Sequence, residues 1–138
     1  MTINEFVMKI MGTPFRDKGR DYSGVDCYGL VRLAYHDVFS VDLPSYSDEY
    51  TDAGNSRESR LELNEILAMN KRHWKQIKDY RPMDVALFTL GGMPIHVGLM
   101  IDSKNFLHCE KKVGTVIESI TSAMWKRRHE GSYRLCQA

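Results

Sequence analysis

The chain has 138 residues, of which 43% are hydrophobic and 27% are charged, and this composition excludes disordered and fibrous proteins. Its 19 Lys and Arg residues are balanced by 18 Asp and Glu residues, so no general basic field indicates a nucleic-acid partner. The length fits one globular unit, and we expect a single domain over residues 1–138.

Cysteine usage and hydropathy indicate the compartment. Three cysteines are too few for a disulfide scaffold, and the odd count leaves at least one thiol free, which is typical of a reducing compartment. The N-terminal stretch "MTINEFVMKIMGTPF" has Glu5 and Lys9 inside its apolar run, so it lacks the apolar core of a signal peptide. No run approaches the roughly 20 apolar residues of a membrane span, and we expect no membrane insertion.

The first half of the chain has the 3.6-residue period of helices. Thr2 and Glu5 have the separation of a capping box, Gly12 supplies a stop, and Asp26 is placed to cap a second helix that begins at Cys27. Helices are therefore predicted over residues 3–11, 27–38 and 59–70, with loops over 15–25 and 41–56.

The second half changes to short runs of β-branched and aromatic residues separated by Gly, Asp, Ser and Lys. These runs are "DVALFTL", "IHVGLMI", "NFLHC", "GTVIESI" and "SYRLC". They predict an antiparallel sheet. Helices first and strands afterwards indicate the α+β fold class.

Cys27 stands at the predicted start of a helix, where a thiol has chemical significance. The helix N-terminus carries partial positive charge and unpaired N–H groups, which favour a thiolate and can receive an oxyanion. A buried small hydrophobic residue is the alternative reading of the same position.

A thiol nucleophile needs a base, and two of the five histidines are candidates. Residues 36, 73 and 129 lie among charged residues and are predicted to face solvent. His96 and His108 lie in consecutive predicted strands, His96 on the side opposite Val97, Leu99 and Ile101 and His108 on the side opposite Leu107 and Cys109. If both apolar sides face one core, the two histidines project from the same face, and the connection must have an odd length or a bulge. With Cys27 they form a Cys-His-His constellation.

The segments "VDCYGLV", "RPMDVALF" and "HVGLMIDSKNFLHC" resemble, in this order, the three motif blocks of the NlpC-type cysteine peptidases. The flanks "GTPFRDKGRDYSG" and "SAMWKRRHEGSYRL" resemble those of the shorter members in phage tail tips. The resemblance thus covers nearly the whole chain. It implies a compact papain-like fold, with the nucleophile at a helix start packed on a small antiparallel sheet.

The resemblance also implies roles for residues. Cys27 would be the nucleophile, His96 the general base and His108 the residue that orients the imidazole, with no metal or organic cofactor. Asp26 would help to bind a substrate amine. The implied reaction is hydrolysis of amide bonds in peptidoglycan stem peptides, commonly between D-glutamate and a diamino acid such as diaminopimelate or lysine.

The sequence departs from the family pattern at three places, and the first, a bulky Tyr28, is expected to reshape recognition of the stem-peptide amine. Tyr28 follows the cysteine where cell-wall members often have a small serine. Phe15 stands where the family usually has a tyrosine that helps to hold the oxyanion, and Tyr22 is a candidate substitute if its loop folds back. The usual Pro-Gly-Asp before the first core strand is "PMD" at residues 82–84.

Other readings stay open from the residues alone. One is a zinc site of Cys27, His96, His108 and Cys109, although strand alternation directs Cys109 away from His108. Another is a tail-assembly or wall-binding protein with a degenerate peptidase-like site. A third is a different Cys-His acyltransferase, such as a transglutaminase-like or amidase-like enzyme. Without a signal peptide, we expect synthesis in the cytoplasm and transport on a virion tail, with tail-tip proteins as partners and action at the bacterial cell wall.

Overall fold

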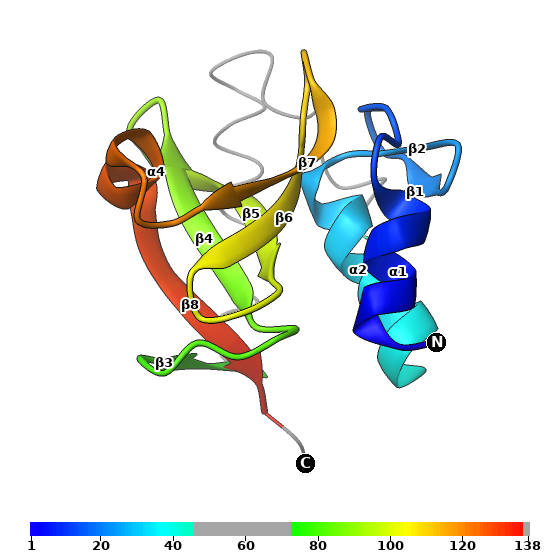
Figure 1. The fold of residues 1–138 in the computed structure, drawn as a ribbon, viewed down its shortest axis with the longest axis horizontal. Helices are drawn as coiled ribbons and strands as arrows, with labels where there is room; N and C mark the ends of the chain where they lie inside the picture. Colours follow the sequence, from blue (N-terminus) through cyan, green and yellow to red (C-terminus); the bar gives the residue numbers. More distant parts are fainter. Residues whose placement is uncertain (46–72, 137–138) are drawn as a thin grey trace.

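The computed structural model describes residues 1–45 and 73–136, and these form helices packed on an antiparallel sheet (Figure 1). The described elements are α1 (Ile3–Ile10), β1 (Arg20–Asp21), β2 (Gly24–Val25), α2 (Cys27–Phe39), β3 (Trp74–Ile77), β4 (Val85–Leu90), β5 (Met93–Met100), β6 (Asn105–Glu110), β7 (Gly114–Ser119), α4 (Ala123–Arg128) and β8 (His129–Leu135). The predicted α+β class is confirmed. The helix predicted over residues 59–70 lies outside the described residues.

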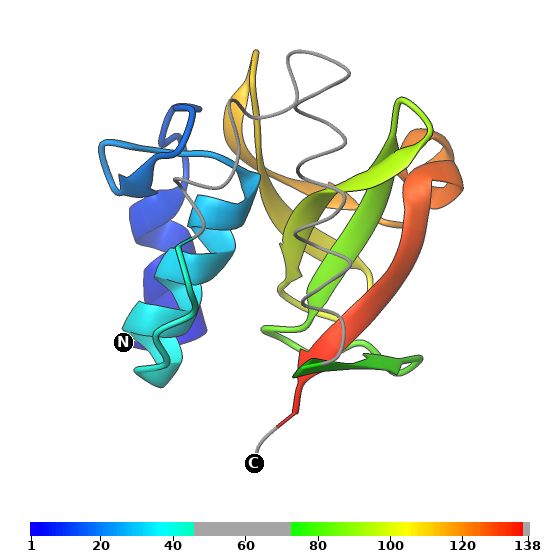
Figure 2. The ribbon, with the colours of Figure 1, turned by 180° about the vertical axis from the view of Figure 1, so that it is seen from behind.

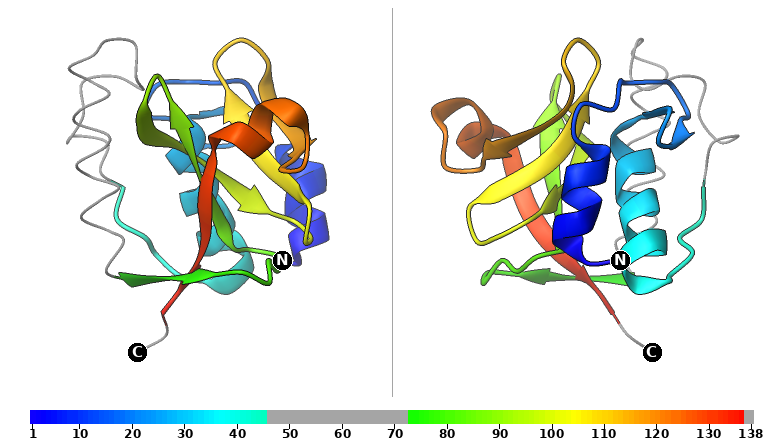
Figure 3. Two further views of the ribbon diagram at one scale, coloured as in Figure 1. Left: turned by 90° about the vertical axis from the view of Figure 1, so that its left-hand side faces the viewer. Right: turned by 45° about the vertical axis from the view of Figure 1, so that its right-hand side comes forward.

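Both N-terminal helices begin where their capping residues predict. Thr2 accepts a hydrogen bond from the N–H of Glu5 while the Glu5 carboxylate accepts one from the N–H of Thr2, which completes the capping box of α1. Asp26 caps α2 by a single bond, in which its carboxylate accepts from the N–H of Gly29. The two helices stand side by side against one face of the sheet (Figure 3). No helix among the described residues is long and apolar enough to cross a membrane.

The main sheet has six strands in the order β3-β8-β4-β5-β6-β7, and every neighbouring pair is antiparallel. The five predicted strands are confirmed. Sequence patterning missed β3 at the edge of the sheet, the β1–β2 hairpin and the early start of β8. That early start corrects the prediction for His129, which is half-buried against Phe88 with 5.4 Å between the ring centroids.

Alternate residues of the central strands build two different cores. Toward α1 and α2 they form a largely aliphatic set that we call the helix-side core, which includes Val85, Leu87, Val97, Leu99, Leu107 and Cys109. On the opposite face they form the aromatic core of Ala86, Phe88, Met100, Phe106, Ile120 and Trp125. Figures 1 and 2 show α1 and α2 on one side of the sheet and α4, which carries Trp125, on the other. The period of two along each strand thus sorts side chains between two environments.

The turn before β4 has a residue with a side chain, Met83, in a backbone conformation that normally favours glycine. Met83 has φ +79°, in the left-handed region that costs a side-chain-bearing residue about 1 kcal/mol or more. Its side chain is buried in the helix-side core, and its carbonyl accepts a hydrogen bond of 2.6 Å from the Tyr35 hydroxyl. The buried Asp84 carboxylate accepts bonds of 2.8 Å from the Arg134 guanidinium and the Arg81 N–H. These contacts hold the strained turn in place.

Candidate active site

Cys27 is the first residue of α2, and a buried carboxylate fixes that end of the helix. Asp26 accepts hydrogen bonds of 2.8 Å from the N–H of Gly29 and 2.9 Å from the Arg20 guanidinium. The ion pair is well shielded, since the Asp26 side chain is only 3% exposed. The cap and the ion pair together fix the start of α2 and so the position of the Cys27 side chain.

The thiol lies beside the segment of β5 that carries His96. Cys27 Sγ is 4.0 Å from the carbonyl oxygen of Ile95, and the backbone of Val97 also interacts with it. These two residues flank His96 in the sequence. The predicted nucleophile and the predicted base are therefore at the same level of the strand.

The two histidines project from the same face of the sheet, as strand alternation predicts. Leu99 pairs with Leu107 across β5 and β6, which sets both histidines on the side opposite these leucines. His96 Nε2 and His108 Nδ1 are 2.8 Å apart, a hydrogen bond between two buried rings. The predicted proximity of the pair is confirmed.

The β5–β6 connection has the odd length that this register requires. The Ile101 N–H donates to the Asn105 carbonyl at 3.0 Å, so the three residues 102–104 form the turn. The Asp102 carboxylate accepts the N–H groups of Lys104 at 2.8 Å and Asn105 at 2.7 Å. A local Asp-centred turn thus determines which face carries the histidines.

Aromatic rings enclose the histidine pair. Trp125 is stacked on His96, with 5.8 Å between centroids and 25° between the planes, and meets His108 edge-on at 4.9 Å. Phe106 lies 4.5 Å from His108, and Phe88 lies 5.9 Å from His96. The rings exclude water from the pair and lower the local dielectric constant.

This enclosure keeps both imidazoles neutral. Burial, helped by the neighbouring His108 and by Arg128, lowers the pKa of His96 to about 3. Burial also lowers the pKa of His108, although the Glu118 carboxylate opposes that shift. At neutral pH His96 is therefore unprotonated, the state in which a general base starts, but a pKa this low makes it a weak proton acceptor in the resting site.

The expectation that the helix terminus favours a thiolate at Cys27 is wrong for the resting protein. Burial, reinforced by the negative charge of Asp26, raises the pKa of the Cys27 thiol to about 12. Burial is the larger of these two causes, and together with the carboxylate next to the sulfur in the chain it outweighs the partial charge of the helix N-terminus. The resting site therefore combines a neutral thiol with a neutral imidazole.

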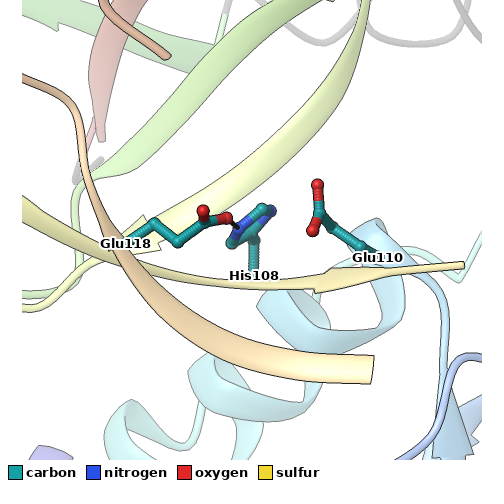
Figure 4. Close-up of side chains that lie close together, drawn as sticks. All are labelled: His108, Glu110 and Glu118. Atoms are coloured by element: carbon teal, nitrogen blue, oxygen red, sulfur yellow. Dashed lines mark hydrogen bonds and ion pairs between the residues drawn. The ribbon is translucent and has the colours of Figure 1, made fainter. Parts of the chain in front are cut away.

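Sequence reasoning missed an acidic residue that continues the histidine pair. Glu118 Oε2 lies 2.6 Å from His108 Nε2, and Figure 4 shows this carboxylate directed at the ring from β7. In the β6–β7 register Glu118 lies opposite Phe106, one diagonal step from His108. The one signal in the sequence was a charged residue inside the apolar run "GTVIESI".

Of the three predicted substrate-binding residues, Asp26 and Tyr28 adjoin Cys27. Asp26 is occupied by the cap and the ion pair described above. The Tyr28 hydroxyl donates to the Pro44 carbonyl at 2.6 Å, and the Arg20 guanidinium lies 5.6 Å from the centre of its ring. Tyr28 is partly exposed, so it forms part of the surface beside the thiol.

The structure does not bring Tyr22 to the thiol. Its hydroxyl donates to the carboxylate of Asp37, and its ring packs near Phe6 and Lys9. Asp37 is ten residues beyond Cys27 in α2, about 15 Å along the helix axis. The β1–β2 hairpin turns Tyr22 toward the C-terminal end of α2, away from Cys27, which corrects the expectation that it substitutes for the family tyrosine.

The zinc reading is not supported at Cys109, whose thiol lies in the helix-side core 3.4 Å from the Val25 carbonyl oxygen. Among the described residues, another group has ligand types and spacing suited to a metal: His108, Glu110 and Glu118 offer donor atoms within 4.8 Å of one another. In this arrangement His108 Nε2 already bonds to Glu118 (Figure 4).

Comparisons with known proteins identify the family and the fold. The profile of the NlpC/P60 family matches residues 12–134. The murein DD-endopeptidase MepS/murein LD-carboxypeptidase of Escherichia coli K12 is 28% identical over 124 residues, which are 90% of this chain and 56% of that protein. The chain thus spans little more than half the length of this relative.

Two solved structures share the fold. An NlpC/P60 family protein from Bacillus cereus superposes with a TM-score of 0.69 at 18% identity, over 98% of this chain and 39% of that one. The NlpC/p60 domain of the peptidoglycan hydrolase SagA superposes with a TM-score of 0.62 at 16% identity, over 99% and 97% of the two chains. The compact α+β fold is that of NlpC/P60 domains.

Proposed function

The chain belongs to the NlpC/P60 family, and from that premise we propose that it is a cysteine peptidase that hydrolyses amide bonds in peptidoglycan stem peptides. Cys27 is the nucleophile, His96 is the general base, and His108 orients the imidazole. The observation that carries this proposal is the 2.8 Å bond between His96 and His108, on the segment of β5 that the Cys27 thiol contacts.

The first chemical step starts from two neutral groups. His96 Nε2 is engaged by His108, so the proton of the Cys27 thiol passes to Nδ1 as the sulfur attacks the amide carbon. The raised pKa of the thiol and the lowered pKa of the imidazole mean that this transfer accompanies attack rather than preceding it. The Cys27 N–H at the start of α2 helps to hold the oxyanion.

The remaining steps return the proton. The imidazolium of His96 protonates the leaving amine as the carbon–nitrogen bond breaks, which leaves a thioester on Cys27. A water molecule then gives a proton to His96 and attacks the thioester, and the released sulfur recovers that proton. Neither a metal nor an organic cofactor is required for these transfers.

The substrate we propose is the bond between D-glutamate and a diamino acid of the stem peptide. The family membership and the murein endopeptidase among the relatives support peptidoglycan as the substrate class. The bond to Pro44 and the contact with Arg20 hold the partly exposed ring of Tyr28, which follows Cys27 in the chain, in one position. A bulky ring at this position favours an extended stem peptide that passes across it.

The decisive experiment is mass spectrometry of the products from defined muropeptides. Wild-type protein and Cys27→Ser are incubated with monomeric stem peptides and with cross-linked dimers, each containing either diaminopimelate or lysine. We expect cleavage at the D-glutamyl bond by wild type alone. Cleavage only at the cross-link would support the peptidase assignment but would show that the D-glutamyl bond is not the bond that is cut.

A second candidate function, binding to wall or tail components without cleavage, is favoured by the position of Tyr22 at Asp37, away from the thiol. It predicts that wild type and Cys27→Ser both leave every muropeptide intact and bind intact peptidoglycan equally in a sedimentation assay. Any product specific to wild type rules it out.

We propose further that the protein is carried on a phage or prophage tail and acts at the bacterial wall. The support is the resemblance of the flanking segments, residues 12–24 and 122–135, to those of tail-tip members. Proteomics of purified particles from the strain that encodes the chain should find it with tail-tip proteins. Its absence from particles that contain every other tail component would contradict this location.

A further inference from the structure

We propose that Glu118 is a positioning residue that fixes the proton on each histidine and stabilises the charge that forms on His96. The inference deepens the proposed function and rests on it. The observation is a continuous chain of hydrogen bonds, in which His96 Nε2 is 2.8 Å from His108 Nδ1 and His108 Nε2 is 2.6 Å from Glu118 Oε2.

The direction of each bond follows from the carboxylate. An ionised carboxylate only accepts hydrogen bonds, so His108 Nε2 must carry a proton and donate it to Glu118. In a neutral His108, Nδ1 then holds a lone pair and accepts the bond from His96 Nε2. A neutral His96 that carries its proton on Nε2 has a lone pair on Nδ1. Nδ1 is therefore its basic nitrogen.

The reverse arrangement is disfavoured. If His108 carried its proton on Nδ1, the lone pair of Nε2 would face the Glu118 carboxylate, and the short contact would be repulsive. His96 would then carry its proton on Nδ1 and could not take the proton of the Cys27 thiol. Glu118 thus acts on the base through the orienting histidine.

The carboxylate also counters the charge of the reaction. When Cys27 attacks, His96 becomes an imidazolium against the rings of Phe88 and Trp125, while Phe106 packs on its partner His108. In such a medium a negative charge at the end of the hydrogen-bond chain has a larger effect than in water. His108 is fully buried while the Glu118 side chain is 32% exposed, so Glu118 ends the chain at the protein surface.

Glu110 provides a matched control. Its side chain is identical to that of Glu118, and it extends from the neighbouring strand β6. One of its carboxylate oxygens lies within 4.8 Å of the corresponding atoms of His108 and Glu118. Figure 4 shows the two carboxylates on different sides of the His108 ring, with the hydrogen bond drawn only to Glu118. Removal of the Glu110 charge therefore changes the local charge without breaking the chain.

The test combines a spectroscopic signature with kinetics. Long-range ¹H–¹⁵N correlation spectra of the labelled full chain show which ring nitrogen carries each proton. We expect Nε2–H on both histidines in wild type, Glu118→Gln and Glu110→Gln, because glutamine can still accept from His108. In Glu118→Ala, His108 should lose this preference. Protonation of His108 at Nδ1 in wild type would overturn the proposal, whatever the activity.

The kinetic arm separates charge from geometry. Glu118→Gln should lower kcat by about tenfold, the equivalent of one pKa unit, with KM unchanged, and Glu118→Ala should lower kcat further. Glu110→Gln should lower kcat much less than Glu118→Gln, because Glu110 has no hydrogen bond to His108. Equal kcat for wild type and Glu118→Gln would refute the charge role. If no muropeptide is cleaved, the alkylation rate of Cys27 by iodoacetamide replaces kcat, so failure of the substrate assignment stays distinct from failure of this inference.

Discussion

The two faces of the central sheet are built from alternate residues of the same strands, yet they perform different tasks. The helix-side core is mostly aliphatic and joins the strands to α1 and α2. The aromatic core encloses two polar rings, His96 and His108, and ends at a carboxylate. Residues that stabilise the fold and residues that serve acid–base chemistry thus alternate along each strand. Substitutions at adjacent positions can therefore be compared for their effects on stability and on catalysis.

The largest expected effect is at the nucleophile, which lies where the helix layer meets β5. Cys27→Ala should abolish cleavage, a loss of several orders of magnitude, because nothing else forms the thioester. The fold should remain, since the cap at Asp26 is unchanged and Cys27 is only partly buried at the edge of the helix-side core. Product analysis measures the loss of cleavage, and thermal unfolding measures whether the fold is retained. Retained cleavage would exclude Cys27 as nucleophile.

The next largest effects are at the histidines of the aromatic side. His96→Ala should lower kcat by roughly 10²- to 10⁴-fold, because it removes the general base. His108→Ala should lower kcat less, since a water molecule can partly replace an orienting group. Steady-state kinetics of both variants give the ranking, and a larger loss for His108 would exchange the two assigned roles.

Adjacent residues of β6 provide the sharpest test of the two-face comparison. Phe106 and Leu107 are both fully buried, but they face opposite cores. Leu107→Ala should lower the free energy of unfolding by about 2–5 kcal/mol and leave kcat per folded molecule unchanged. Phe106→Leu should cost less stability and lower kcat, because its ring contacts His108. The comparison fails if Leu107→Ala impairs catalysis more than Phe106→Leu.

The last effect, which leaves the chemical step at neutral pH unchanged, is the pH dependence of stability, and the aromatic side should control it. The pKa of His96 is about 3 in the folded protein and near its ordinary value of about 6.5 when unfolded. The unfolded chain therefore binds more protons below pH ~6.5, so stability falls as pH falls toward about 3, by at most ~1.4 kcal/mol per pH unit for each such histidine. His108 and His129, whose pKa values burial also lowers, act in the same direction.

Urea unfolding between about pH 7 and about pH 4 measures this slope. His96→Gln should flatten the curve, because one buried titrating group is gone. Leu107→Ala should move the whole curve downward in parallel. A variant His96→Gln with an unchanged slope would show that His96 does not control acid sensitivity.

Several parts of the fold and site were predictable because their determinants are local. The capping box of α1 and the Asp26 cap of α2 each depend on residues three apart, and the two-residue period assigns His96 and His108 to one face. The Asp102 turn set the register between them. The edge strand β3 was missed because a short, half-exposed run carries little apolar pattern.

The sequence by itself determined the fold class, the family and the pairing of the two histidines, since these depend on local periodicity and on motifs that can be read in order. The tertiary structure decided the link from His108 to Glu118, because that contact depends on the β6–β7 register. It also decided that Cys27 rests as a thiol and that Tyr22 bonds to Asp37. Burial and long-range packing set these properties, and neither is encoded by the spacing of residues along the chain.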